Sequence, residues 1–292
     1  MNVPVMAGLT WPVVLAVLFG ALLHASWNAV VKSGDDKALD TVMIHVSGCV
    51  LAIPVVAVAG FAPSVAWPWI LASMTVHIGY FVALAGAYKH GDLGFAYPIM
   101  RGLAPLLVAL ASGHVIGEAL SLAAWLGVIG ISAGVLLVGL SRSGLAGGSH
   151  GHALRWALLN AGIIALYTVI DGFGVRASGN ALQYVSTLFL VNSLPYFLLV
   201  MWQRGERRPQ AWAYLRGRWR IGVLGALASA GSYGIALWAM TRAPVAAVAA
   251  LRETSVLFAA LIGAQWLKEG FGPRRAAGTA LIACGVVALR LL

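Results

Sequence analysis

Apolar runs of about 20 residues follow one another along almost the whole chain, and this length matches what a helix needs to cross a bilayer. Strands of a membrane barrel would instead show segments of about 10 residues with alternating hydrophobicity. Of the 292 residues, 61% are hydrophobic and only 10% are charged, and the mean hydropathy is +0.89. These features predict an all-α polytopic membrane protein.

Charged residues and Gly- or Pro-rich breaks divide the chain into ten predicted transmembrane spans. Their ranges are 12–31, 40–59, 68–88, 93–113, 119–140, 153–174, 181–202, 219–241, 244–266 and 273–292. The longest connection, 203–218, is short and arginine-rich, which leaves no room for a soluble catalytic domain. Because no charged residue precedes Lys32, the first span is interpreted as a retained helix and not as a signal peptide.

The basic residues are distributed unequally between the two ends of the predicted spans. The odd-numbered connections carry 14 of them: Lys32, Lys37, Lys89, Arg142, Arg155, Arg204, Arg207, Arg208, Arg216, Arg218, Arg220, Lys268, Arg274 and Arg275. The even-numbered connections and the termini carry only Arg176, Arg242 and Arg290. The positive-inside rule then places the odd connections in the cytoplasm and both termini outside. The net charge of +10 is thereby explained without a nucleic-acid partner.

Two halves of the chain resemble each other. A shift of 151 residues aligns "GVIGISAGV" from Gly127 with "GTALIACGV" from Gly278, and it also places Glu118 on Glu269 and Arg101 on Arg252. The predicted units are residues 1–144 and residues 145–292, each with five spans. Because five is odd, the second unit starts on the opposite side of the membrane, which predicts an inverted repeat around a central cavity.

The segments that carry this repeat resemble a known family. "YPIMRGLAPLLVALASGHVIGEALSLAAWLGVIGISAGVLLVGL" and "VAALRETSVLFAALIGAQWLKEGFGPRRAAGTALIACGVVAL" resemble the EamA-type repeat of the drug/metabolite transporter superfamily, as found in bacterial aromatic amino-acid exporters. The resemblance implies ten helices in two inverted five-helix bundles, a place in the bacterial inner membrane, and export of small metabolites such as amino acids. Many family members have cytoplasmic termini, so the resemblance and the loop charges imply opposite orientations.

Polar and aromatic side chains lie within the predicted spans, often four residues apart on one helix face. The predicted substrate-binding residues are Asn28, His77, Tyr80, Tyr97, Arg101, Tyr167, Asp171, Tyr233, Trp238, Arg252 and Glu253. A bare charge at the centre of a span costs about 2.5–3.5 kcal/mol even on the mildest scale, so the four charged members favour a function. We expect His77, Tyr80, Tyr97 and Tyr167 to line a shared cavity.

The buried charges balance, with two arginines and two acids. Arg252 and Glu253 are adjacent, about 100° apart around a helix, so each needs a partner elsewhere. We expect Arg252 to contact a substrate carboxylate and Arg101 to pair with a fixed acid, while Asp171 or Glu253 receives an ammonium group. A zwitterionic amino acid has this combination of charges.

Other functions remain open. A multidrug exporter of organic cations would use the acids and aromatic rings alone, and a channel is disfavoured only by the matched halves. A membrane-embedded enzyme would need a converging nucleophile and base or metal ligands, and no such His/Glu cluster is present in the sequence. We therefore expect no cofactor, no metal site and no enzymatic activity. Glu253, Asp171 and His77 are candidate proton carriers.

Overall fold

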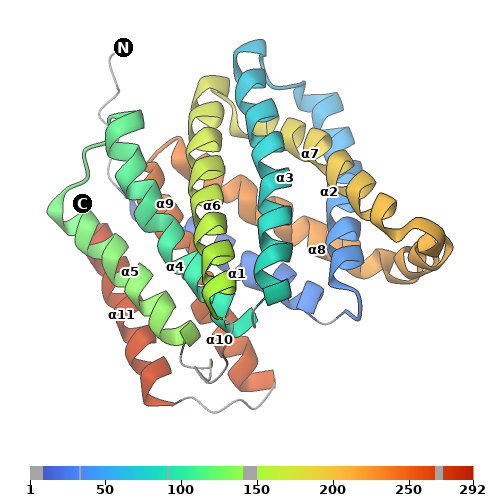
Figure 1. Cartoon of the computed structure of the whole chain (residues 1–292). Helices are drawn as coiled ribbons and strands as arrows, with labels where there is room; N and C mark the ends of the chain where they lie inside the picture. The colour runs from blue at the N-terminus through green and yellow to red at the C-terminus, as the bar shows by residue number, and fades with distance from the viewer. Residues whose placement is uncertain (1–8, 33, 91–92, 141–149, 267–271, 292) are drawn as a thin grey trace.

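The computed structural model describes residues 9–32, 34–90, 93–140, 150–266 and 272–291, and Figure 1 shows helices packed side by side. The α-helices of the described residues are α1 (Trp11–Lys32), α2 (Lys37–Ala59), α3 (Trp67–His90), α4 (Leu93–Ala111), α5 (Leu122–Leu140), α6 (His150–Ser178), α7 (Ala181–Arg204), α8 (Arg208–Met240), α9 (Val245–Arg252), α10 (Ser255–Trp266) and α11 (Pro273–Arg290). Lys268, Glu269, Arg142 and the predicted boundary at residues 144 and 145 lie outside the described residues.

Seven segments of the described chain are long and apolar enough to cross a membrane. The last of them, Ala181–Met240, covers α7 and α8 together. Helices α9 and α10 have only 8 and 12 residues, and α11 contains three arginines within its 18 residues. None of these three helices is therefore by itself long and apolar enough to count as a membrane span. The all-helical, multi-pass expectation is supported, and the number of ten spans remains a prediction.

Local sequence signals account for several helix starts. The Asp36 carboxylate accepts from the Leu39 backbone N–H at 3.1 Å and caps α2, and the Asn180 side chain accepts from two backbone N–H groups of α7. Proline occupies the first turn of both α8 and α11, where the missing N–H has no helical partner to lose.

The predicted connection 203–218 is mostly helical in the structure. Helix α8 begins at Arg208 and has 33 residues, well beyond what one span needs. Ala211 and Leu215 are buried on one side of this extension, and the Arg218 side chain ion-pairs with Asp40 of α2.

The predicted span 244–266 is broken in its middle. Helix α9 ends at Arg252, a turn follows at Glu253 and Thr254, and α10 begins at Ser255. The Glu253 and Thr254 amides bond three residues back, and the Thr254 hydroxyl donates to the Leu251 carbonyl at 2.7 Å. This competing bond from a buried hydroxyl favours a bend over a continuous helix. Broken helices of this kind often mark functional positions in membrane proteins.

Helices α5 and α11 approach each other through glycines, and both lie at one edge of the bundle in Figure 1. A Cβ on Gly134 would lie 2.7 Å from the Gly278 carbonyl oxygen, and a Cβ on Gly278 would lie 2.9 Å from that of Gly134. Gly127 and Gly285 show the same reciprocal contact, at 2.9 and 2.8 Å. Close approach through small residues is a common way to hold membrane helices together.

We expect Gly134→Ala to lower the melting temperature in detergent, with a loss of about 1–3 kcal/mol, because the added methyl meets backbone that cannot move aside. Gly130→Ala is the matched control on the same helix, since its Cβ would meet the Gly285 Cα at an ordinary 3.4 Å. Equal melting temperatures of the two variants would contradict the close contact between α5 and α11.

Candidate functional site

A buried ion pair joins α4 to the turn between α9 and α10. The Arg101 Nε lies 2.8 Å from the Glu253 Oε2, and the two residues are only 7% and 4% exposed. Arg101 lies near the middle of α4, and Glu253 lies at the break between α9 and α10. The contact is therefore formed deep inside the helix bundle. Each charge provides the partner that the other needs inside a membrane protein. The expectation that Arg101 pairs with a fixed acid is confirmed.

His24 of α1 lies on the other side of the Arg101 guanidinium. Its Nε2 is 3.3 Å from the Arg101 Nη2, and its Nδ1 is 3.3 Å from the Trp27 Nε1 donor. A neutral imidazole has only one acceptor nitrogen, so it can accept only one of these two hydrogen bonds at a time. The approach of His24 to Arg101 has no local signal in the sequence, because the two residues are 77 positions apart.

Arg252 has no ion-pair partner among the described residues. Its Nε is buried without a hydrogen bond within the same part of the chain, and its Cζ lies 5.2 Å from the centre of the Tyr233 ring. An arginine over an aromatic face is stabilised by the ring quadrupole and keeps its donors available. Arg252 is therefore held in place without being neutralised.

The Asp171 carboxylate lies on the far side of Tyr233 and is fully buried. Tyr184 donates a hydrogen bond to its Oδ1 at 2.8 Å, and Tyr233 donates to its Oδ2. Hydroxyl donors satisfy the oxygens without cancelling the charge. Within the described residues no cation forms an ion pair with Asp171, so Arg252 and Asp171 are opposite charges joined through one tyrosine.

The aromatic residues predicted in α3 and α6 surround this region. The His77 ring stacks on Tyr167 at 4.4 Å between centroids, and Tyr80 packs edge-on against Tyr167 at 6.1 Å. Tyr97 belongs to the same apolar cluster. The His77 Nδ1 lies 2.8 Å from the Ser73 carbonyl oxygen of its own helix.

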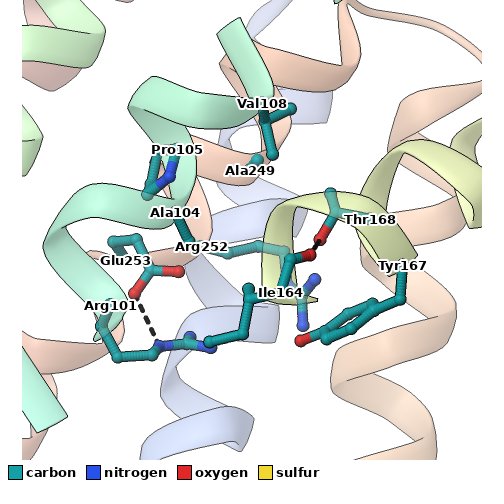
Figure 2. A pocket seen from close by; sticks show the side chains of 10 residues that line it. All are labelled: Arg101, Ala104, Pro105, Val108, Ile164, Tyr167, Thr168, Ala249, Arg252 and Glu253. Carbon is teal, nitrogen blue, oxygen red and sulfur yellow. Dashed lines mark hydrogen bonds and ion pairs between the residues drawn. The ribbon is translucent and has the colours of Figure 1, made fainter. Parts of the chain in front are cut away.

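A small cavity of about 10 Å³ lies among these groups, close to the smallest volume that holds one water molecule. Figure 2 shows its lining, which consists of Arg101, Ala104, Pro105, Val108, Ile164, Tyr167, Thr168, Ala249, Arg252 and Glu253. An amino acid does not fit in this volume. In this structure the cavity is therefore closed to a molecule of that size.

Four of the predicted site residues line the cavity, namely Arg101, Tyr167, Arg252 and Glu253. Asp171, Tyr233, His77, Tyr80 and Tyr97 lie around it through the contacts described above. Two predicted residues make other contacts instead. The Asn28 amide donates to the His24 carbonyl of its own helix at 2.8 Å, and the Trp238 ring lies 4.8 Å from the Arg242 guanidinium at the end of α8.

Ion pairs also connect residues of the two predicted halves at both ends of the bundle. At one end, Arg176 of α6 binds Glu118 at 2.5 Å and donates to the Met240 and Ala243 carbonyls, while Glu118 accepts from the Val245 N–H at the start of α9. The sequence interpretation used Glu118 only to align the repeats, so its role in this contact was missed.

At the other end of the bundle, Arg204 binds Asp36 at 2.7 Å and Arg218 binds Asp40 at 2.8 Å. The Tyr214 hydroxyl also donates to Asp40 at 3.0 Å. The "DDKALD" stretch before and within the first turn of α2 was the available signal for these acids. The ion pair of Glu118 holds the α4–α5 connection against the second predicted half. The ion pairs of Asp36 and Asp40 hold the start of α2 against the same half at the other end of the bundle.

The fold and the site together describe a multi-pass helical membrane protein with a charged, closed centre. Residues 152–291 match the EamA-like transporter family, which supports a membrane transporter of the drug/metabolite transporter type. No curated protein sequence matches the chain. A solved structure described as "Crystal structure of protein" aligns with a TM-score of 0.72 over 96% of each chain at 19% identity, a likeness of fold alone.

Arg101→Gln should destabilise the protein by about 3–5 kcal/mol, because Glu253 is then a buried charge without its partner. Adding Glu253→Gln should recover most of the lost stability, since no uncompensated charge is left. Thermal unfolding in detergent measures both effects, and Arg242→Gln, at an exposed arginine, is the control. An unchanged melting temperature in Arg101→Gln would show that the ion pair does not stabilise the fold.

Proposed function

We propose that the protein is a transporter that exports small zwitterionic metabolites, most simply amino acids, by alternating access. The proposal includes ten spans arranged as two inverted units, residues 1–144 and 145–292, and a place in the bacterial inner membrane. The match of the second half to a transporter family supports the general activity. The substrate is inferred from the arrangement of charges around the closed cavity.

The observation that carries the proposal is the position of Arg252. This guanidinium reaches the cavity, has no acidic partner among the described residues, and lies over Tyr233, whose hydroxyl is bonded to Asp171. A carboxylate fits the planar fork of an arginine with two parallel hydrogen bonds. An ammonium fits Asp171 and the tyrosine faces beside it. One small zwitterion satisfies both charges.

The break between α9 and α10 supports a substrate site at this depth. Discontinuous helices in transporters place polar backbone and side chains near the middle of the membrane. Here the break carries Glu253 and Thr254 and follows Arg252 directly. The partner helix α4 carries Arg101 at the position that the repeat alignment matches with Arg252. The two arginines are used differently, because Arg101 is occupied by Glu253.

The helix packing supports the inverted repeat. Under the shift of 151 residues, Gly127 corresponds to Gly278 and Gly134 corresponds to Gly285. The contact of Gly127 with Gly285 is then the counterpart of the contact of Gly278 with Gly134, as a two-fold relation between α5 and α11 requires. The pairs α3–α6 and α8–α1 correspond in the same way, and both are extensive. Rocking of such units around a central site is the usual route to alternating access.

Efflux of organic cations is the second candidate. Asp171 is an acid without a cationic partner in the described residues, and Tyr184 and Tyr233 both contact it. A cation surrounded by aromatic rings needs no arginine. This alternative predicts that transport depends on Asp171 and does not change when the arginine fork at position 252 is replaced by a lysine ammonium.

Arg252→Lys should fold but lose about tenfold or more of its amino-acid flux, because an ammonium does not reproduce the bidentate fork for a carboxylate. Flux is measured in proteoliposomes with a panel of amino acids and organic cations, with and without a pH gradient. Arg242→Lys, at an exposed arginine, is the matched control and should transport normally. Full amino-acid flux in Arg252→Lys would rule out the carboxylate contact, and cation flux that survives in this variant would favour the second candidate.

A further inference from the structure

The first third of α8 extends beyond the part of the helix that a bilayer core can cover. The 33 residues of α8 are about 50 Å long at 1.5 Å per residue, and the hydrocarbon core is about 30 Å thick. The end of α8 at Met240 is held by Arg176, and counting back about 20 residues from there reaches residue 221. With the membrane-spanning part of α8 taken as residues 221–240, residues 208–220 lie at and beyond the membrane surface.

This extension has two unlike faces. Ala211 and Leu215 are buried, and Arg218 is paired with Asp40, so one face packs on the protein. The other face carries Arg208, Trp212, Arg216, Trp219 and Arg220, all exposed, and we name these five residues the basic stripe. Positions 208, 212, 216 and 220 are four apart and follow one another along the same side of the helix.

The arginines of the basic stripe form no ion pair within the described residues. The nearby carboxylates of Asp36 and Asp40 are taken by Arg204 and Arg218, which are not part of the stripe. Arg208 makes one hydrogen bond, to the Met201 carbonyl, and the Arg220 guanidinium lies 5.4 Å from the centre of the Trp219 ring. The stripe is therefore a concentration of exposed positive charge without an ion-pair partner in the described residues.

The two tryptophans indicate which partner meets this charge. Trp212 and Trp219 are 47% and 53% exposed, and tryptophan rings concentrate at the level of lipid headgroups. A polybasic segment beside a transmembrane helix is attracted to anionic lipids. We propose that the basic stripe binds the phosphate headgroups of anionic phospholipids in the leaflet at the α7–α8 end of the bundle.

Bound lipid would stabilise the protein through this end of the bundle. The stripe continues directly into the segment whose Tyr214 and Arg218 hold Asp40 of α2. A lipid that fixes the start of α8 at the membrane surface also fixes these contacts. Because a ligand that binds only the folded state raises its stability, anionic lipid should raise the melting temperature.

The test is thermal unfolding of the full chain in a neutral detergent with added phosphatidylglycerol or phosphatidylcholine. We expect phosphatidylglycerol to give the larger increase in melting temperature, and high salt to remove the difference. The double variant Arg216→Gln/Arg220→Gln should lose most of this difference. The double variant Arg155→Gln/Arg274→Gln removes two exposed arginines from the same end of the bundle and should keep it.

Three results would overturn the proposal. These are a full phosphatidylglycerol effect in the stripe variant, an equal loss in both double variants, and the same stabilisation by soluble glycerol phosphate, which would indicate a free-anion site. If the stripe variant does not fold, native mass spectrometry of Arg216→Gln and Arg274→Gln gives the decision. Fewer bound phosphatidylglycerol molecules in Arg216→Gln alone support the stripe, and equal numbers contradict it.

Discussion

The buried contact between Arg101 and Glu253 is the interaction on which the centre of the molecule depends. It neutralises one arginine and one acid in a region where bare charges are costly, and it attaches α4 to the break between α9 and α10. Because Glu253 is occupied in this way, Arg252 is left with an aromatic partner only. Arg101 and Arg252 occupy matching positions in the two repeats. In the structure Arg101 forms a buried ion pair, whereas the Arg252 guanidinium has only an aromatic partner among the described residues.

Ion pairs join residues of the two predicted halves at both ends of the bundle. Glu118 and Arg176 link the α4–α5 connection to the start of α9 at one end, and Asp36 and Asp40 hold arginines of α7 and α8 at the other. Under the proposed alternating access, opening toward either side separates one of these sets of ion pairs. The α5–α11 glycine contact lies at the edge of the bundle, where two helices can stay together while others move.

The sequence was informative about class and less so about geometry. Apolar runs of the right length identified membrane helices, and the charged residues within them identified Arg101, Arg252 and Glu253, which do line the cavity. The break after Arg252 depends on a side-chain bond from Thr254, which hydropathy does not register. Asn28 and Trp238 share a helix with site residues, but contacts with His24 and Arg242 decide where their side chains lie. Long-range pairs such as Arg176 with Glu118 have no local signal.

Transport of one amino acid and two of its derivatives tests the zwitterion site most directly, since the protein itself is left unchanged. The amide of the amino acid lacks the carboxylate that Arg252 would bind, and the N-acetyl derivative lacks the ammonium that Asp171 would bind. Counterflow into proteoliposomes should be fast for the parent amino acid and weak for both derivatives. Equally fast transport of the amide would contradict the account, because a site that ignores the carboxylate has no use for Arg252.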